Sequence, residues 1–111
     1  MNIIGNVEGK TCILLDDMVD TGGSLCGAAK AVKEIGGATQ VYACASHGVL
    51  SGPATDRLNE SCIKELLLLD TIPYPTDKPK CDIIKYLSVA PVFADAIDRI
   101  YEEISISNLF E

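Results

Sequence analysis

The chain has 111 residues, of which 48% are hydrophobic, and a formal net charge of −7. This length suits one small domain with its own hydrophobic core. The nine basic residues are scattered rather than clustered, which excludes the usual nucleic-acid-binding surface, and no apolar run is long enough to cross a bilayer. The first ten residues, MNIIGNVEGK, lack the pattern of a signal peptide, so we expect a cytoplasmic protein.

The first half of the chain predicts a strand, a loop, a helix and a second strand. Residues 10–15, KTCILL, form the first strand, and residues 16–23 form a loop. A helix then begins near Ser24 and ends at Gly36 and Gly37. Residues 39–46 form the second strand. The apolar face of the helix consists of Leu25, Ala28, Ala29, Val32 and Ile35.

The second half predicts a short helix, two further strands and a final helix. The short helix has Pro53 in its first turn, and the strand at 64–70 carries an unbroken leucine run that favours burial on both faces. A proline-rich loop at 71–80 leads to a fourth strand at 82–89. The last helix opens at Pro91, and its apolar face consists of Phe93, Ile97, Ile100 and Ile104.

This alternation of strands and helices predicts an α/β fold with a mainly parallel sheet flanked by helices on both faces. In such sheets, ligands bind where strands end and helices begin. The stretch LLDDMVDTGGS, residues 14–24, lies at such a place, between the first strand and the first helix.

The glycines of this stretch predict a cradle for an anion. Gly22 and Gly23 allow a sharp turn and a close approach to a ligand, and the following helix offers unpaired N–H groups. The hydroxyls of Thr21 and Ser24 add two donors. One phosphate monoester fits such a cradle.

Asp16 and Asp17 need a different partner, because they would repel the same phosphate. Vicinal sugar hydroxyls suit carboxylates, and a magnesium ion on those hydroxyls would offset the charge. The stretch therefore predicts a site for a molecule with a phosphate at one end and a diol at the other, such as a pentose 5-phosphate. The alternative is that Asp20 or Ser24 only caps the helix, while Asp16 and Asp17 are solvated loop residues.

The five cysteines, Cys12, Cys26, Cys44, Cys62 and Cys81, are odd in number and contain no C-x-x-C pair. This spacing argues against a disulfide framework and against a zinc site. Cys44 and His47 supply only two candidate ligands, so no metal site is predicted among the side chains. We expect buried or half-buried thiols.

The segment CILLDDMVDTGGS resembles the phosphoribosyl diphosphate binding motif of the type I phosphoribosyltransferase fold. Further segments resemble the C-terminal domain of the ribose-phosphate diphosphokinase (phosphoribosyl pyrophosphate synthetase) family over essentially the whole chain. They are MNIIGNVEGKTC, VYACASHGVLSGPA, DTIP, LSVAPVFADAI and SISNLFE. The resemblance implies one phosphoribosyltransferase-like domain, residues 1–111, as a fragment of a longer two-domain enzyme.

The resemblance also implies roles for individual residues. Asp16 and Asp17 would hold the ribose hydroxyls, and the loop of Asp20, Thr21, Gly22, Gly23 and Ser24 would hold the 5-phosphate. Family members often have Thr at the position of Ser24, and the hydroxyl is kept. The ATP contacts, the metal-binding residues and a catalytic lysine and arginine would lie in parts of the family that match nothing here. The resemblance thus places no catalytic residue in this chain, which we expect to be inactive alone.

For the tail, SISNLFE, the resemblance implies a regulatory site, and the alternative is a frayed chain end. In the family, this segment helps to form a site between subunits where phosphate and ADP compete, which assigns Ser105, Ser107 and Phe110 to it in a homo-oligomer, by resemblance a hexamer. His47, the only histidine, is either a general base or a residue that orders its loop and contacts a neighbouring subunit or nucleotide. Lys10, Lys64, Lys78 and Lys80 show no clustering and are predicted to be solvated.

Three functions remain in view at this point. The first is transfer of the diphosphoryl group of ATP to ribose 5-phosphate, with Mg²⁺, to give phosphoribosyl diphosphate and AMP. The second is a nucleobase phosphoribosyltransferase, which shares the motif but would need a base-binding hood. The third is a non-catalytic ribose-phosphate-binding or regulatory subunit.

Overall fold

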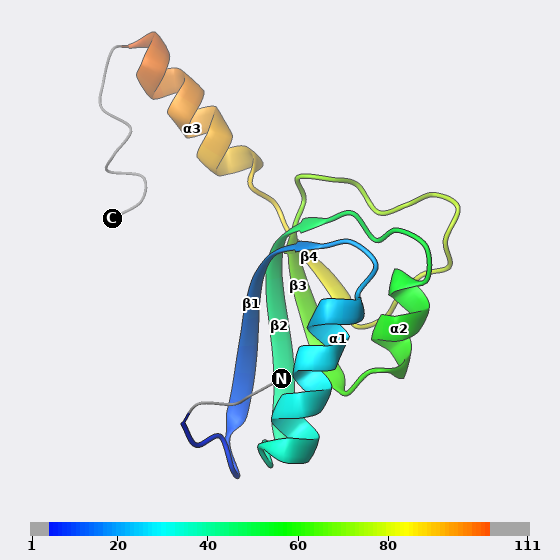
Figure 1. Ribbon diagram of the computed structural model, residues 1–111. Coiled ribbons are helices and arrows are strands. Elements are labelled where there is room, and N and C mark those ends of the chain that lie inside the picture. Colours follow the sequence, from blue (N-terminus) through cyan, green and yellow to red (C-terminus); the bar gives the residue numbers. More distant parts are fainter. Residues whose placement is uncertain (1–4, 103–111) are drawn as a thin grey trace.

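A four-stranded parallel sheet forms the centre of the protein (Figure 1). The computed structural model describes residues 5–102. The strands follow one another in space in the order β1-β2-β3-β4, and every neighbouring pair is parallel. All four strands predicted from the sequence are present: β1 (Thr11–Val19), β2 (Gln40–Gly48), β3 (Ile63–Leu69) and β4 (Ile84–Leu87).

The helices also follow the predicted order. Helix α1 (Gly23–Lys30) continues into a π-helical segment, η1 (Ala31–Ile35), and a left-handed Gly37 with φ of 77° follows its end. Helix α2 spans Ala54–Glu60 and α3 spans Ala90–Tyr101. Pro53 precedes α2 as its N-cap residue instead of lying in the first turn, one position from the prediction.

Strand β1 ends four residues later than the sequence predicted. Asp16, Met18 and Val19 pair with Ala45, His47 and Gly48 of β2, so the predicted loop at 16–19 is wrong. Carboxylates have low strand propensity, but a long neighbouring strand offers them a complete ladder, and tertiary pairing overrides the local preference. The same pairing extends β2 to Gly48 and places His47 within a strand instead of after it.

The core lies between the sheet and the helices α1 and α2. Leu50, Leu58, Leu66, Leu68 and Val41 are fully enclosed there. In α1, Leu25 and Ala29 face the core as predicted, but Ile35 is 74% exposed, so its place on the predicted apolar face is wrong. The helix widens into the π-helical turn before this residue, which shifts the 3.6-residue periodicity on which the prediction relied.

The second face of the sheet is uncovered among residues 5–102, so the prediction of helices on both faces is wrong. Helices α1 and α2 lie on the same side (Figure 1), and Ile13, Leu15 and Leu67 are exposed on the other. The leucine run of β3 is consequently buried on alternate residues only. The strand order explains why the helices share one face. Each new strand is added on the same side of the previous one, and right-handed crossovers in a constant direction place every connecting helix on the same face of the sheet.

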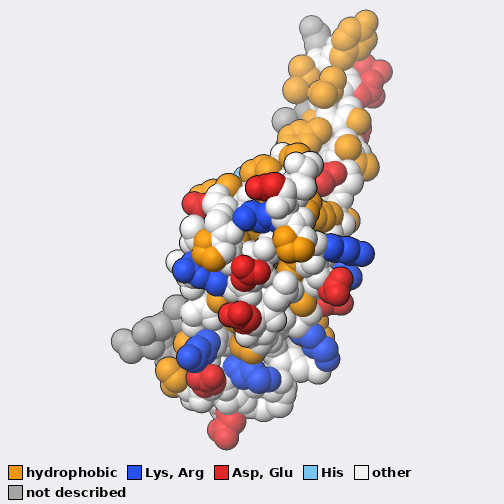
Figure 2. Space-filling view, turned by 90° about the vertical axis from the view of Figure 1, so that its right-hand side faces the viewer, with side chains coloured by type: hydrophobic (Ala, Val, Ile, Leu, Met, Phe, Trp, Pro, Cys, Tyr) orange, Lys and Arg blue, Asp and Glu red, His pale blue; other side chains and the backbone are white. Residues whose placement is uncertain are grey.

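Helix α3 projects from the carboxyl end of the sheet (Figure 1). None of its residues is buried, and its predicted apolar face, including Phe93, Ile97 and Ile100, is exposed. Figure 2 shows hydrophobic side chains gathered along this projection. Pro91 lies in its first turn, as predicted, while Ile104 lies outside the described residues.

Within residues 5–102, no helix combines the length and the apolar character that crossing a bilayer requires. The cysteines are buried or half-buried, as the sequence predicted. Burial raises the pKa values of the Cys26 and Cys81 thiols, which keeps both groups neutral near pH 7.

Candidate functional site

A cavity of about 270 Å³ lies at the carboxyl end of β1, where the chain turns into α1. It is lined by Asp16, Met18, Val19, Asp20, Thr21, Gly22, Gly23, Ser24 and Leu25. Six of the seven residues that the sequence singled out for substrate binding therefore lie around one space. The seventh, Asp17, is not among the lining residues.

The alternation of side chains along β1 separates the two adjacent carboxylates. Asp16 pairs with Ala45, which is buried on the helix-covered face, so the Asp16 side chain lies on the side of α1. The Asp17 side chain lies on the uncovered face, as does the side chain of Leu15 two residues earlier. The Asp17 N–H donates to Oδ1 of Asp16 over 2.8 Å, which fixes the orientation of the Asp16 carboxylate.

The N-terminus of α1 opens into this cavity. Gly22 is the N-cap residue and has a left-handed backbone with φ of 82°, which glycine adopts without the penalty of a Cβ atom. Its carbonyl accepts the first intrahelical bond, from Cys26 N–H over 3.0 Å. The N–H groups at the start of the helix precede this bond and therefore lack an intrahelical acceptor.

No side chain among residues 5–102 caps this helix. The structure thus gives no support to the alternative that Asp20 or Ser24 serves as a helix cap. The unpaired N–H groups carry partial positive charge and remain available to an anion. The lining hydroxyls of Thr21 and Ser24 lie at the same helix end.

Arg57 of α2 supports the loop from outside, and sequence reasoning missed it. Its Nη1 donates to the Thr21 carbonyl over 3.2 Å. A Cβ atom on Gly23 would lie 3.1 Å from the same Nη1. A side chain at Gly23 would therefore press on the end of Arg57 by a few tenths of an ångström. Nothing in the local sequence could have shown this contact, because the two residues are 34 positions apart.

The loop after β2 gives the second support. The Val19 carbonyl accepts from Val49 N–H over 2.9 Å and from Leu50 N–H over 3.1 Å. The Asp20 carbonyl accepts from Ser51 N–H over 2.8 Å. These bonds hold the backbone on both sides of the turn from strand to helix, so the cavity is preorganised.

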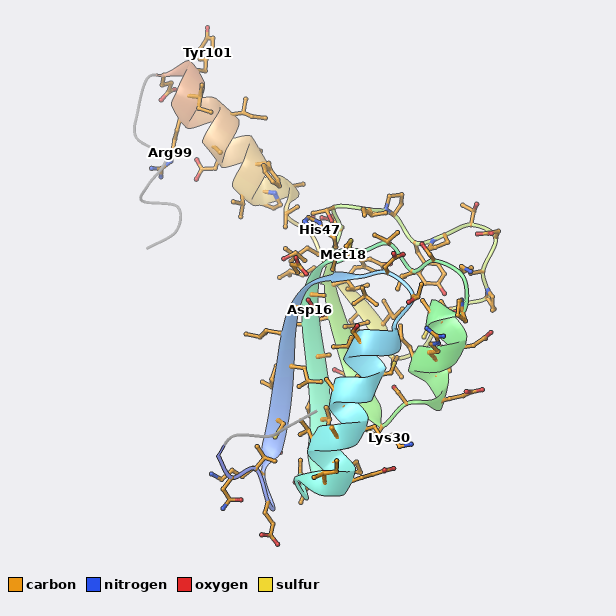
Figure 3. The ribbon with its side chains drawn as sticks, viewed as in Figure 1. Asp16, Met18, Lys30, His47, Arg99 and Tyr101 are labelled. Atoms are coloured by element: carbon orange, nitrogen blue, oxygen red, sulfur yellow. The ribbon has the colours of Figure 1, made fainter. Side chains whose placement is uncertain are left out.

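His47 lies at the same end of the sheet, beside Met18 (Figure 3). Its Nδ1 is 2.8 Å from the Thr71 hydroxyl oxygen, and the Thr71 hydroxyl donates to the Ser46 carbonyl over 3.2 Å. The direction of the His47–Thr71 bond depends on the tautomer of the imidazole, and Nδ1 is its donor when the Thr71 hydroxyl donates to Ser46. His47 does not line the cavity, and its bonds connect β2 to the segment after β3.

The remaining predicted residues fall into two groups. Lys78 is half-buried and its Nζ donates to the Gly52 carbonyl over 2.7 Å, so it is not merely solvated, whereas Lys10, Lys64 and Lys80 are exposed. Ser105, Ser107 and Phe110 lie outside the described residues. Within the described part of the chain, no group of three or more His, Cys, Asp or Glu side chains could hold a metal ion.

Comparisons with known proteins identify the family of the chain. The whole chain, residues 1–111, matches the family described as "Phosphoribosyl synthetase-associated domain". It is 59% identical over 110 residues to a ribose-phosphate pyrophosphokinase of Caldanaerobacter subterraneus, covering 99% of this chain and 34% of the relative. It is also 59% identical to a ribose-phosphate pyrophosphokinase of Clostridium tetani, covering 100% of this chain and 34% of that relative.

A solved structure is similar as well. The phosphoribosylpyrophosphate synthetase from Mycobacterium smegmatis superposes with a TM-score of 0.83 at 44% identity, covering 90% of this chain and 33% of that one. The chain thus spans about a third of the length of the proteins it matches. It belongs to the phosphoribosyl synthetase-associated domain family.

Proposed function

We propose that this chain provides the ribose 5-phosphate site of a ribose-phosphate diphosphokinase. The enzyme transfers the diphosphoryl group of ATP to ribose 5-phosphate and releases phosphoribosyl diphosphate and AMP. The observation that carries the proposal is the cavity in which Asp16 faces the uncapped N-terminus of α1. The relatives named as ribose-phosphate pyrophosphokinases support the same activity.

The two ends of the substrate would bind to the two kinds of groups that line the cavity, the donors at the helix end and the carboxylate of Asp16. The 5-phosphate would lie against the N–H groups at the start of α1 and the hydroxyls of Thr21 and Ser24. The ribose hydroxyls would donate to Asp16, in charge-assisted hydrogen bonds. The proposal makes Asp16 the main acceptor for the ribose hydroxyls. Asp17 contributes less, because its side chain lies on the opposite face of β1.

Magnesium fits the donor chemistry of this cavity. Mg²⁺ is held in phosphoryl-transfer sites by one or two carboxylates together with substrate oxygens, and Asp16 is a carboxylate that lines the cavity. When bound, the ion would offset negative charge between carboxylate and substrate. The residues of this chain contribute the positioning of ribose 5-phosphate, which holds the anomeric hydroxyl still for the incoming diphosphoryl group.

The wider assignments rest on the resemblance and on the relatives. We place the chain as a C-terminal domain within a longer, cytoplasmic, homo-oligomeric enzyme that takes ATP with Mg²⁺. Ser105, Ser107 and Phe110 remain predicted members of a regulatory site for phosphate or ADP in a hexamer. The runner-up functions are a non-catalytic ribose-phosphate-binding subunit and a nucleobase phosphoribosyltransferase.

The two aspartates offer a matched test on this chain itself. Ribose 5-phosphate is titrated in the presence of Mg²⁺ against the wild type, Asp16→Asn and Asp17→Asn, and binding is measured by calorimetry and amide chemical shifts. Hydrogen bonds to a charged group are worth about 1.5–3 kcal/mol, so Asp16→Asn is expected to weaken binding by about tenfold or more. Asp17→Asn should change it by less than about twofold.

Two further results decide the assignment. Inorganic phosphate should bind Asp16→Asn as well as it binds the wild type, because the phosphate is held at the helix end. If Asp16→Asn and Asp17→Asn weaken ribose 5-phosphate equally, or if neither does, the assigned orientation of the substrate is wrong. On a longer relative, assays with ATP, and with free nucleobases and phosphoribosyl diphosphate, separate the three candidate functions.

A further inference from the structure

A second cavity, of about 330 Å³, lies beside β4. It is lined by Tyr74, Lys78, Lys80, Cys81, Ile84 and Tyr86. Ile84 pairs with Leu66, which is buried under the helices, so this cavity opens on the helix-covered side of the sheet. It shares no lining residue with the cavity at β1, which belongs to the strand at the opposite edge of the sheet.

The wall of this second cavity is a long loop that is held in place. Residues 70–83 connect β3 to β4, and loops of this length in compact domains are commonly functional. The Tyr74 hydroxyl donates to the Pro79 carbonyl, and Lys78 Nζ donates to the Gly52 carbonyl. The Cys81 thiol donates to Asn59 Oδ1 of α2 over 3.2 Å. The cavity therefore has a fixed shape.

The lining combines aromatic surface with positive charge. Two tyrosine rings and Ile84 supply the apolar part, and the ammonium groups of Lys78 and Lys80 supply the charge. Burial raises the pKa values of Cys81, Tyr74 and Tyr86, so these groups are neutral near pH 7, and no Asp or Glu appears among the described lining residues. Nothing in the lining repels an anion.

We infer that this cavity binds a small planar aromatic compound that carries an anionic substituent. The ring lies against the tyrosines, with which aromatic groups interact favourably beyond simple area burial. The anionic substituent reaches the two ammonium groups, and Lys78 can accept this role because only one of its three N–H donors is used by Gly52. The volume is near the lower limit of small-molecule pockets, which favours one ring system over an extended ligand.

The position of Lys78 connects this cavity to the first one. Its acceptor, Gly52, follows Ser51, whose N–H donates to the Asp20 carbonyl. A ligand that contacts Lys78 therefore changes the surroundings of a segment that supports the anion cradle. The Gly52 and Ser51 amide signals report on this connection.

The experiment is a titration of the 111-residue chain with phenyl phosphate and with benzoate, followed by NMR. Both probes should shift the resonances of Tyr74, Cys81, Ile84 and Tyr86. Inorganic phosphate has no ring and benzyl alcohol has no charge, so each should bind this cavity at least about tenfold more weakly. Binding of phenyl phosphate at the first cavity is followed separately through residues 20–25. A preference for phenyl phosphate over benzoate would favour a phosphate as the anionic substituent, and the reverse preference would favour a carboxylate.

Exposed residues provide variants that preserve the fold. Lys80→Gln and Tyr86→Leu should each weaken phenyl phosphate at this cavity by about tenfold, from loss of a charged hydrogen bond or of ring contact. Lys64→Gln removes an exposed lysine outside the lining and should change nothing. The inference is overturned if the aromatic anions leave the Tyr74 and Tyr86 resonances unmoved. It is equally overturned if Lys80→Gln binds them as the wild type does.

Discussion

At the scale of single residues, the anion cradle depends on two glycines for different reasons. Gly22 is needed for its backbone, because its φ of 82° places it in the left-handed region. Gly23 has no such conformation, and its constraint is one of space, because a Cβ atom there would lie 3.1 Å from Arg57 Nη1. The sequence predicted that Gly23 allows a close approach to a ligand, and the structure adds that a Cβ atom there would also lie tightly against the end of Arg57.

Gly22→Ala tests the backbone requirement. Left-handed backbone costs an ordinary residue about 1–2 kcal/mol, so the free energy of unfolding should fall by about that amount. Gly27→Ala is the matched control, since Gly27 lies inside α1 with open space around its would-be Cβ atom. It should raise the free energy of unfolding by about 0.5–1 kcal/mol. Urea denaturation of both variants measures this, and equal effects of the same sign would contradict the assignment.

Arg57→Ala tests the support of the loop. Without the bond to the Thr21 carbonyl, the cradle should lose preorganisation. The affinity for inorganic phosphate should fall by about threefold to tenfold, less than for a direct charged hydrogen bond, because Arg57 acts through the loop. Arg57→Lys should restore part of the affinity. Calorimetry measures both, and unchanged binding in Arg57→Ala would show that the loop keeps its shape without this residue.

His47 offers a test of its tautomer. When the Thr71 hydroxyl donates to the Ser46 carbonyl, its bond to His47 places the proton of the neutral imidazole on Nδ1, and this is the arrangement that we predict. Nitrogen chemical shifts of the ring above pH 8 should therefore show a protonated Nδ1 in the wild type, and a mixture of tautomers in Thr71→Val. A protonated Nε2 in the wild type would contradict the network, and a ring that responds to ribose 5-phosphate would restore the general-base hypothesis.

At the scale of elements, the sequence predicted all four strands and the helices, because hydrophobic periodicity and glycine or proline at the ends are local signals. It failed where long-range pairing decides the outcome. The acids of β1 and the histidine of β2 are strand residues because each strand gives the other its hydrogen bonds. It also failed on the layers, since helical coverage of both faces depends on the direction of the crossovers and not on any local pattern. The candidate cavity was predictable because its residues are contiguous in the sequence. The contact of Arg57 with this loop was not predictable, because Arg57 belongs to another helix, α2.

The attachment of α3 depends on Asp70, which gives a pH prediction. Asp70 Oδ1 accepts from Val89 N–H over 2.9 Å, and this bond, followed by one from the Ser88 hydroxyl, holds the pKa of Asp70 below its ordinary value. A carboxyl with a lowered pKa in the folded state contributes stability above its unfolded pKa of about 3.9, and this contribution is lost as the pH falls through the lower folded value. The Val89 amide signal should therefore be constant at neutral pH and move only below about pH 3.9.

Asp70→Asn is the control for this prediction. Its Val89 amide should show no such transition, because the amide side chain does not titrate. NMR spectra of both proteins between neutral and acidic pH make the comparison. A Val89 signal that moves above pH 5 in the wild type, or equally in both proteins, would show that Asp70 does not hold the start of α3.

At the scale of the whole molecule, residues 5–102 form a well-supported cavity and two apolar surfaces that no other described residue covers. The uncovered sheet face exposes Leu15 and Leu87, and α3 exposes Phe93 and Ile97, although all four are large hydrophobic side chains. Patches of this kind are rare on monomeric proteins. The relatives are about three times longer, so these surfaces are consistent with a unit that works as part of a larger protein.

The last prediction concerns activity and follows from the charges at the site. Phosphoryl transfer needs cations around the transferred group, whereas the lining of the first cavity contains two carboxylates and no lysine or arginine among the described residues. The 111-residue chain alone should therefore bind ribose 5-phosphate but release no AMP from ATP and Mg²⁺.

A chimera in which this chain replaces the matching third of the Clostridium tetani relative should be active, since the two are 59% identical over 111 residues. The same chimera with Asp16→Asn should lose about tenfold or more in kcat/KM for ribose 5-phosphate, from loss of charged hydrogen bonds to the diol, and with Asp17→Asn much less. Ribose 5-phosphate-dependent AMP release by the isolated chain would overturn the first expectation, and an inactive chimera that binds ribose 5-phosphate normally would favour a non-catalytic subunit.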